Sequence, residues 1–86
     1  MTHIEAAQRV ADHFGLDVDL VVGKGGSSVV AQPRRVLLVL WRRLGLTWEE
    51  IGTELGLASS SVYYRAQAIG DDDKAIARQI MEDADA

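Results

Sequence analysis

The chain has 86 residues, a net charge of −4 at pH 7 and no cysteine. Its length suits one domain with one modest hydrophobic core, and the missing cysteines exclude disulfides and thiolate metal sites. No apolar run reaches the length of a membrane span and no basic flank precedes an apolar segment near the N-terminus, so we expect a cytoplasmic globular protein with no membrane partner.

The N-terminal quarter of the chain predicts two helices. Thr2 and Glu5 have the spacing of a capping box, which predicts a helix over residues 3–14. Its apolar stripe consists of Ile4, Ala7, Val10 (or Ala11) and Phe14. Asp17 is placed to cap a second, short helix that ends at Val22.

Residues 23–28 read Gly-Lys-Gly-Gly-Ser-Ser and predict a flexible loop. Their order does not match the G-x-x-x-x-G-K-[ST] motif of a nucleotide-binding loop, and no buried strand precedes them. Two interpretations stay open. The segment is either a linker or a loop that contacts DNA phosphates, with Lys24, Ser27 and Ser28 as its candidate residues.

A central helix is expected over residues 33–44. Pro33 suits the first turn of a helix, and the apolar run over residues 36–41 predicts burial on every side. A strand is the alternative, but twelve residues bounded by proline and glycine favour a helix. Arg34 and Arg35 lie at its start, where cations oppose the helix dipole. They suggest a phosphate or acidic partner, although simple solvation would also account for them.

Residues 47–69 predict a helix-turn-helix. Thr47 and Glu50 repeat the capping-box spacing, Gly56 can end the first helix in the left-handed conformation, and Ser59 can cap the second. The remaining features are a glycine that would let another helix pack closely (Gly52), an apolar stripe (Val62, Ala66, Ile69) and a helix end at Gly70. An ordinary helical hairpin within a small bundle is the alternative.

The orientation of the second helix follows from placing Val62 toward the core. At about 100° per residue, the side chains that then point outward are Ser60, Tyr63, Tyr64 and Gln67, with Arg65 on their flank. Hydroxyl groups, an amide, aromatic rings and a guanidinium suit phosphate oxygens and base edges. We therefore expect this face to contact DNA.

Basic residues gather in the middle of the chain. Residues 1–23 carry one base and four acids, residues 24–65 carry six bases and three acids, and residues 66–86 carry two bases and six acids. Asp71 can cap a last helix, whose acidic end over residues 82–86 is expected to fray. The predicted fold is therefore all-α: a single domain over residues 1–86, built as a small bundle of five to six helices.

Several stretches occur in an order that resembles a known family. They are FGLDV at residues 14–18, the glycine and lysine loop, VAQPRRV at residues 30–36, LT at residues 46–47 and EIG at residues 50–52. This order resembles the C-terminal DNA-binding domain (domain IV) of the bacterial replication initiator DnaA, over roughly Ile4 to Ile80. The A-x-P-R stretch and the E-I-G opening are its most specific parts.

The resemblance implies an all-helical fold related to the Trp-repressor type of helix-turn-helix, and binding to double-stranded DNA at short origin boxes. It would place minor-groove contact on the loop from Lys24 to Ser28. It would place phosphate contact on Arg34, with Arg35 as a second candidate. The residues that it would place in the major groove are Ala58, Ser59, Ser60 and Ser61.

We expect sequence-selective binding to double-stranded DNA by a small replication-accessory or transcription-regulatory factor, such as a phage protein. The alternative is a protein–protein interaction module that kept the fold and lost DNA binding, which the net charge and the single charged loop residue favour. A homodimer is also considered, with Trp48 and the last helix as candidate interface surfaces and Trp41 in the core.

Neither an enzyme nor a cofactor is expected. The sequence shows no nucleophile–base pair and no paired-carboxylate spacing. His3 and His13 have no further histidine or cysteine nearby, so we expect surface histidines and no metal site.

Overall fold

Six α-helices make up the described part of the computed structural model, which covers residues 1–23 and 28–85. They are α1 (His3–Phe14), α2 (Val18–Val22), α3 (Ser28–Arg43), α4 (Trp48–Leu55), α5 (Ser59–Ala66) and α6 (Asp71–Asp85). No residue of these two ranges lies in a strand. The predicted all-α class with five to six helices is therefore confirmed. None of the described helices is both long and apolar enough to cross a membrane.

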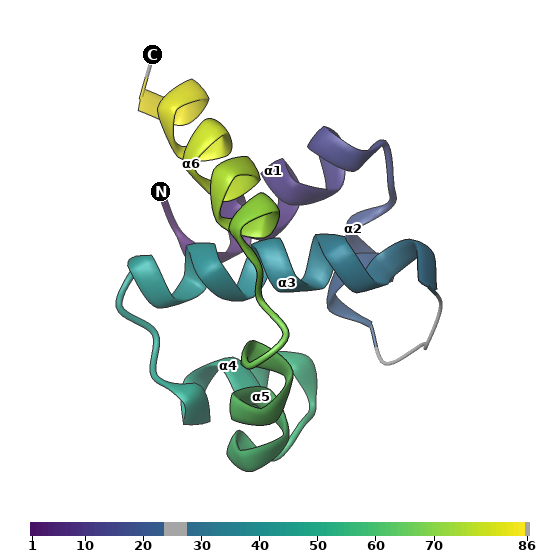
Figure 1. Cartoon of the computed structure of the whole chain (residues 1–86), viewed down its shortest axis with the longest axis vertical. Coiled ribbons are helices and arrows are strands. Elements are labelled where there is room, and N and C mark those ends of the chain that lie inside the picture. Colours follow the sequence, from purple (N-terminus) through teal and green to yellow (C-terminus); the bar gives the residue numbers. More distant parts are fainter. Residues whose placement is uncertain (24–27, 86) are drawn as a thin grey trace.

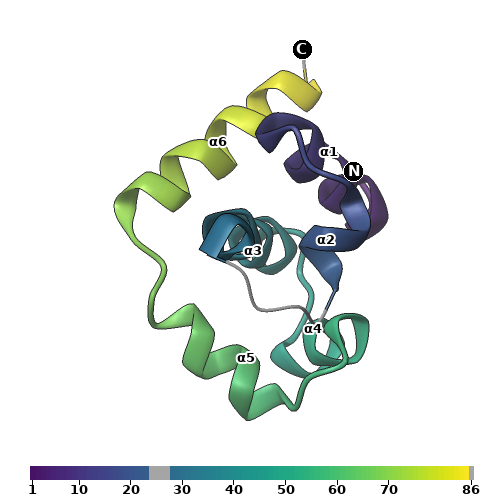
Figure 2. The same ribbon diagram turned by 90° about the vertical axis from the view of Figure 1, so that its right-hand side faces the viewer.

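The long helix α3 lies at the centre of the molecule. Helices α1 and α6 lie on one side of it and the α4–α5 pair lies on the other (Figures 1 and 2). Its central residues 36–41 are all buried. The apolar run of the sequence is thus explained, because a helix with neighbours on opposite sides needs no continuous polar face.

The start of α3 differs from the prediction. The helix begins at Ser28, and Pro33 lies inside it with its ring fully buried. The predicted start at Pro33 was wrong because the residues before it continue the helix and bury Val30, which is only 4% exposed. Contacts of Val30 and of the proline ring offset the hydrogen bond that a proline cannot donate.

The predicted caps of α1 and α2 are confirmed. The Thr2 hydroxyl accepts the N–H of Glu5 at 3.1 Å, and the Asp17 carboxylate accepts the N–H of Asp19 at 3.0 Å. After α1, Gly15 adopts the left-handed conformation with φ of 66°. These local hydrogen bonds and the glycine define the starts of α1 and α2 and the end of α1 without any tertiary contact.

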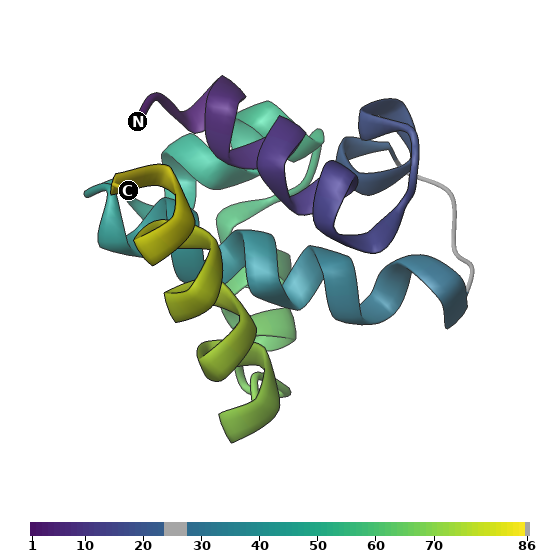
Figure 3. The ribbon, with the colours of Figure 1, turned by 90° about the horizontal axis from the view of Figure 1, so that it is seen from above.

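One member of the predicted α1 stripe is exposed, and another, Phe14, is only half-buried. Ile4 is 69% exposed, and the buried residues are Ala6, Ala7, Val10 and Ala11. Ile4 lies roughly a quarter turn from the centre of this buried face. The prediction was wrong because small alanine side chains form the face that packs on α3, where α1 lies beside the central helix (Figure 3).

Helices α4 and α5 are joined by a short turn at Gly56. The capping box that begins α4 is confirmed: the Thr47 hydroxyl accepts the Glu50 N–H at 3.1 Å, and the Glu50 carboxylate accepts the Thr47 N–H at 3.0 Å. Gly56 ends α4 with φ of 69°, as predicted. The order of helix, glycine turn and helix is therefore present.

Gly52 of α4 has a different neighbour from the one we expected. A Cβ added to it would lie 2.5 Å from the carbonyl oxygen of Leu57. The Leu57 N–H in turn donates to the Gly52 carbonyl at 2.8 Å. The predicted approach of another helix was wrong, because the backbone of the turn itself fills this space.

Helix α5 is displaced and shorter than predicted. Its N-cap is Ala58, which makes no side-chain capping bond, and Ser59 is the first helical residue. The helix ends at Ala66 instead of reaching Gly70. The predicted end was wrong because the N–H groups of the next three residues donate to carbonyls only three positions earlier, which tightens the chain into a turn.

Candidate nucleic-acid interface

Seven of the predicted DNA-contacting residues lie together on α5 and its C-cap. The helix is anchored by Val62, which is fully buried, as predicted. The seven residues, all exposed, are Ser59, Ser60, Ser61, Tyr63, Tyr64, Arg65 and Gln67. Tyr64 is 80% exposed and Tyr63 is 54% exposed. Packing of α5 therefore leaves two aromatic side chains on the surface of the protein.

A stack of three side chains holds α5 relative to α3. The Arg42 guanidinium lies 4.3 Å from the ring centre of Trp48, and the Tyr63 ring meets the Trp48 ring edge-on at 5.7 Å between centres. Arg42 also donates to the Leu46 carbonyl at 2.9 Å. Trp48, which we considered as an interface residue, is half-buried inside this stack.

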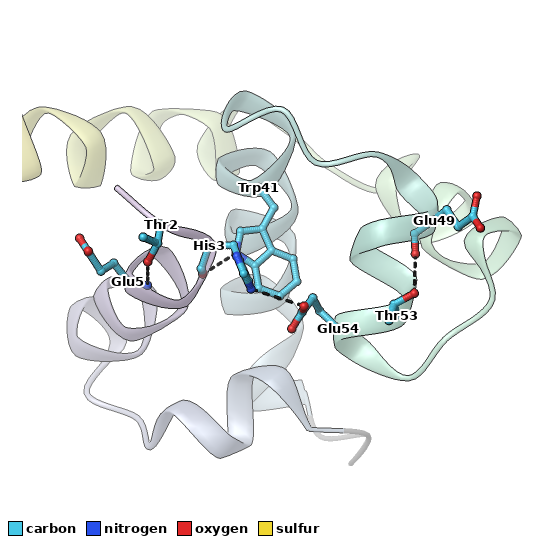
Figure 4. Close-up of polar contacts among 7 residues, drawn as sticks. All are labelled: Thr2, His3, Glu5, Trp41, Glu49, Thr53 and Glu54. Carbon is cyan, nitrogen blue, oxygen red and sulfur yellow. Dashed lines mark hydrogen bonds and ion pairs between the residues drawn. The ribbon is translucent and has the colours of Figure 1, made fainter.

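A second set of contacts joins α1 to α3 and to α4 (Figure 4). The Trp41 indole N–H donates to the His3 carbonyl at 2.8 Å, and His3 Nε2 lies 3.4 Å from Glu54 Oε1. Trp41 is 2% exposed, as predicted for a core residue. The exposed side chains of α5 thus project from a pair of helices that is fastened to the rest of the protein at two places.

Arg34 binds the end of α2. Its guanidinium donates to the carbonyl oxygens of Leu20, Val21 and Gly23 at 3.0, 3.1 and 2.7 Å. These are carbonyls at the end of α2, which have no partner within a helix. Burial lowers the pKa of Arg34, and the positive charge of Arg65 lowers it further. The structure therefore gives Arg34 a positioning role that no local sequence pattern indicates.

Arg35 forms an ion pair with Asp73 at the start of α6. Its Nε donates to the Asp73 carboxylate at 2.8 Å, and that carboxylate also accepts the Gly70 N–H at 3.0 Å and the Gln32 amide at 3.3 Å. Asp73 is 3% exposed. The carboxylate that caps α6 is thus Asp73, and the prediction of Asp71 as the cap was wrong because Asp71 is already the first helical residue.

These contacts shift the pKa of Asp73. Burial of its carboxyl group raises the pKa, but the hydrogen bonds from Gly70, Arg35 and Gln32 and the charge of Arg35 lower it by more. The net pKa therefore lies below its usual range. The carboxylate stays ionised at neutral pH and links α3 to α6.

The predicted site therefore divides into three parts. The α5 residues form one exposed face, Arg34 and Arg35 have partners inside the protein, and Ser28 is exposed at the first residue of α3. Lys24 and Ser27 lie outside the described residues.

Three cations gather beside α5. Arg42, Arg43 and Lys74 line an open depression of about 390 Å³, together with Trp48 and Gln67. Arg43 and Lys74 are exposed, and neither forms an ion pair with another residue in the described ranges. Lys74 follows three aspartates, so the sequence around it gives no sign of a basic region. Its charge joins those of Arg42 and Arg43 only because the start of α6 packs on α3.

No protein-family model matches the chain, and a search of curated proteins likewise finds no match. Within the described residues, no group of three or more histidine, cysteine, aspartate or glutamate side chains is placed to hold a metal ion. The function is therefore inferred from the exposed face of α5 and the charges around it.

Proposed function

We propose that the protein binds double-stranded DNA, with α4 and α5 acting as a helix-turn-helix and α5 entering the major groove. The observation that carries this proposal is the outer face of α5. Tyr63 and Tyr64 are exposed there on a helix whose opposite side is anchored by Val62. Tyr63 keeps more than half of its surface exposed although its ring contacts Trp48, and Tyr64 is mostly exposed. An external partner accounts for this exposure better than folding does.

The chemistry of this face suits base edges and phosphates. Serine hydroxyls and backbone N–H groups gather at the start of α5, where phosphate oxygens bind readily in DNA complexes. Gln67, at the other end, carries an amide that can pair with adenine in the major groove. The major groove is wide enough to admit one α-helix with its side chains.

The charges around α5 support the same docking. Arg65 lies on one flank of the helix, and Arg42, Arg43 and Lys74 lie along the other. A helix in the major groove has a phosphate backbone on each side, so cations on both flanks would meet both strands. We reassign Arg34 and Arg35 from phosphate binding to the positioning of α2 and α6 around α3.

The resemblance to domain IV of DnaA adds support and sets a limit. It favours a replication-accessory or transcription-regulatory factor that selects its DNA sequence. The family's recognition helix begins with an R-D-H-T-T type signature, whereas residues 58–62 here read ASSSV. The family's loop carries several arginines, whereas Lys24 is the one charged residue here. We therefore expect a target sequence different from the initiator's own box.

A second candidate function is binding of another protein. The net charge of −4 opposes indiscriminate attraction to nucleic acid. Exposed tyrosines are also common at the centre of protein interfaces. In this alternative the outer face of α5 binds a protein partner, and the cations beside it contact acidic side chains.

Fluorescence anisotropy with a labelled pool of random duplexes tests the proposal. We expect salt-sensitive binding, followed by enrichment of a discrete site on repeated selection. Tyr64→Ala should weaken binding to the selected duplex about tenfold while changing the affinity for random duplexes much less. Ile4→Ala, which removes another exposed apolar side chain away from α5, should change neither affinity. Absence of binding at low salt would exclude the DNA proposal and favour a protein partner.

A further inference from the structure

A cleft of about 480 Å³ separates α5 from the N-terminal half of α3. Three leucines supply its apolar wall: Leu38 from α3, Leu55 from α4 and Leu57 from the turn. Three arginines, Arg34, Arg35 and Arg65, also line it. Its volume falls within the range of small-molecule sites, which combine an apolar wall with a few polar groups.

The positive charge of this cleft is not balanced from within. None of the described residues that line it is acidic. Arg35 is neutralised by Asp73, but Arg34 donates to uncharged carbonyls and Arg65 forms no ion pair with another described residue. Arg34 and Arg65 both line the cleft, and the pKa of Arg34 is lowered by burial and further by repulsion from the positive charge of Arg65. An anion placed between them would relieve this repulsion.

We propose that the cleft binds a small organic anion with an apolar body. The anionic group would lie against Arg34 and Arg65, and the apolar body would lie against Leu38, Leu55 and Leu57. This inference goes beyond DNA binding, because it concerns the space between α3 and α5. Tyr64 and Arg65 line this space and also belong to the proposed DNA-contacting face.

The leucines distinguish this ligand from a simple phosphate. A phosphate group, free or on DNA, would use the two arginines and leave the three leucines in contact with water. An amphipathic anion would satisfy the arginines and also remove apolar surface from water, which adds to its affinity. Competition with inorganic phosphate therefore separates the two kinds of anion.

The test uses two fluorescent probes and the whole chain, without DNA. The first probe is 8-anilinonaphthalene-1-sulfonate, an aromatic anion, and the second is N-phenyl-1-naphthylamine, its neutral analogue. We expect one anionic probe to bind per chain, with at least tenfold higher affinity than the neutral probe. Inorganic phosphate at the same concentration should not displace it.

Two variants locate the site. Arg65→Gln should weaken binding of the anionic probe about tenfold and leave the neutral probe unchanged. Arg9→Gln, which removes an exposed charge from α1, is the matched control and should change neither. Ala68→Phe places a ring in the cleft from an exposed position and should block both probes.

Equal binding of the anionic probe to the Arg65→Gln and Arg9→Gln variants would overturn the proposal. So would displacement by phosphate, which would indicate a site for a bare anion. Undiminished binding to the Ala68→Phe variant would place the probe elsewhere and overturn it as well. Circular dichroism of each variant confirms that the helices are retained. Because no DNA is present, none of these results depends on the proposed DNA binding.

Discussion

Arg34 and Arg35 are adjacent in the sequence but bind different partners in the fold. Arg34 donates to carbonyls at the end of α2, and Arg35 pairs with Asp73 at the start of α6. Both partners are many residues away along the chain, so no local pattern indicates them. At the residue scale, therefore, a cation near a helix start can be recognised from sequence, whereas its partner cannot.

Asp73 leads to a prediction about stability and pH. Its pKa is lowered in the folded protein. Between this lowered pKa and the ordinary pKa of an aspartate, the unfolded chain binds more protons than the folded one, so the free energy of unfolding rises with pH. The contribution of Asp73 is complete above the ordinary pKa of an aspartate. It is lost as the pH falls through the lowered pKa. Asp73→Asn should therefore lower the free energy of unfolding at pH 7 by about 1–3 kcal/mol.

Urea denaturation of both proteins at a series of pH values measures this effect. The difference between wild type and Asp73→Asn should shrink as the pH falls through the lowered pKa of Asp73. Asp72→Asn, an exposed neighbour on the same helix, is the control and should change stability by less than about 0.5 kcal/mol. A constant difference at all pH values would contradict the assigned role of the ionised carboxylate.

At the element scale, the local boundary signals of α1, α2 and α4 were predicted correctly, whereas Ser59 and Asp71 are first helical residues and not the predicted caps. Thr2, Asp17 and Thr47 cap helices as expected, and Gly15 and Gly56 end them. The helix boundaries that depend on tertiary packing were predicted wrongly. The early start of α3 requires burial of residues around Pro33, and the turn after α5 is set by a run of short-range backbone bonds.

Gly52 provides the prediction at this scale. A Cβ at this position would lie 2.5 Å from the Leu57 carbonyl oxygen, so Gly52→Ala forces the turn between α4 and α5 to shift. We expect a loss of about 1–3 kcal/mol in the free energy of unfolding, measured by chemical denaturation. Gly70→Ala, where an added Cβ meets nothing within 4 Å, should cost much less. Equal effects of the two substitutions would show that the turn does not constrain α4.

At the scale of the whole molecule, the tertiary fold brings together basic residues that lie far apart in the sequence. The chain carries a net charge of −4, yet Arg42, Arg43 and Lys74 meet in one depression beside α5. Two of these residues end α3, and the third lies in the acidic first part of α6. The middle of the chain was correctly recognised as basic in the sequence, but Lys74 joins that region only through the packing of α6 on α3.

This arrangement makes a prediction about the salt dependence of DNA binding. If Arg43 and Lys74 contact phosphates, then Arg43→Gln and Lys74→Gln should each reduce the slope of log K against log salt concentration by about 0.9. Affinity for all duplexes should fall together, because phosphate contacts carry no sequence information. Anisotropy titrations over a range of salt concentrations measure the slope.

Arg78→Gln is the matched control for this charge change, since Arg78 is exposed on α6 and lines neither the cleft nor the open depression beside α5. An unchanged slope in both variants, with DNA binding otherwise intact, would exclude the flank that carries Arg43 and Lys74 as a phosphate-binding surface. An equal reduction in the Arg78→Gln variant would instead indicate a general effect of net charge.

The sequence by itself determined the all-α class, the caps of α1, α2 and α4, the glycine turns that end α1 and α4, the burial of the central helix and the outward face of α5. These follow from hydrophobic periodicity and from hydrogen bonds between residues a few positions apart. Only the tertiary structure decided the partners of Arg34 and Arg35, the neighbour of Gly52, and the cations and cleft on either side of α5. The physical reason is that each of these depends on the distance between side chains far apart in sequence, which packing of the helices sets and local patterns do not encode.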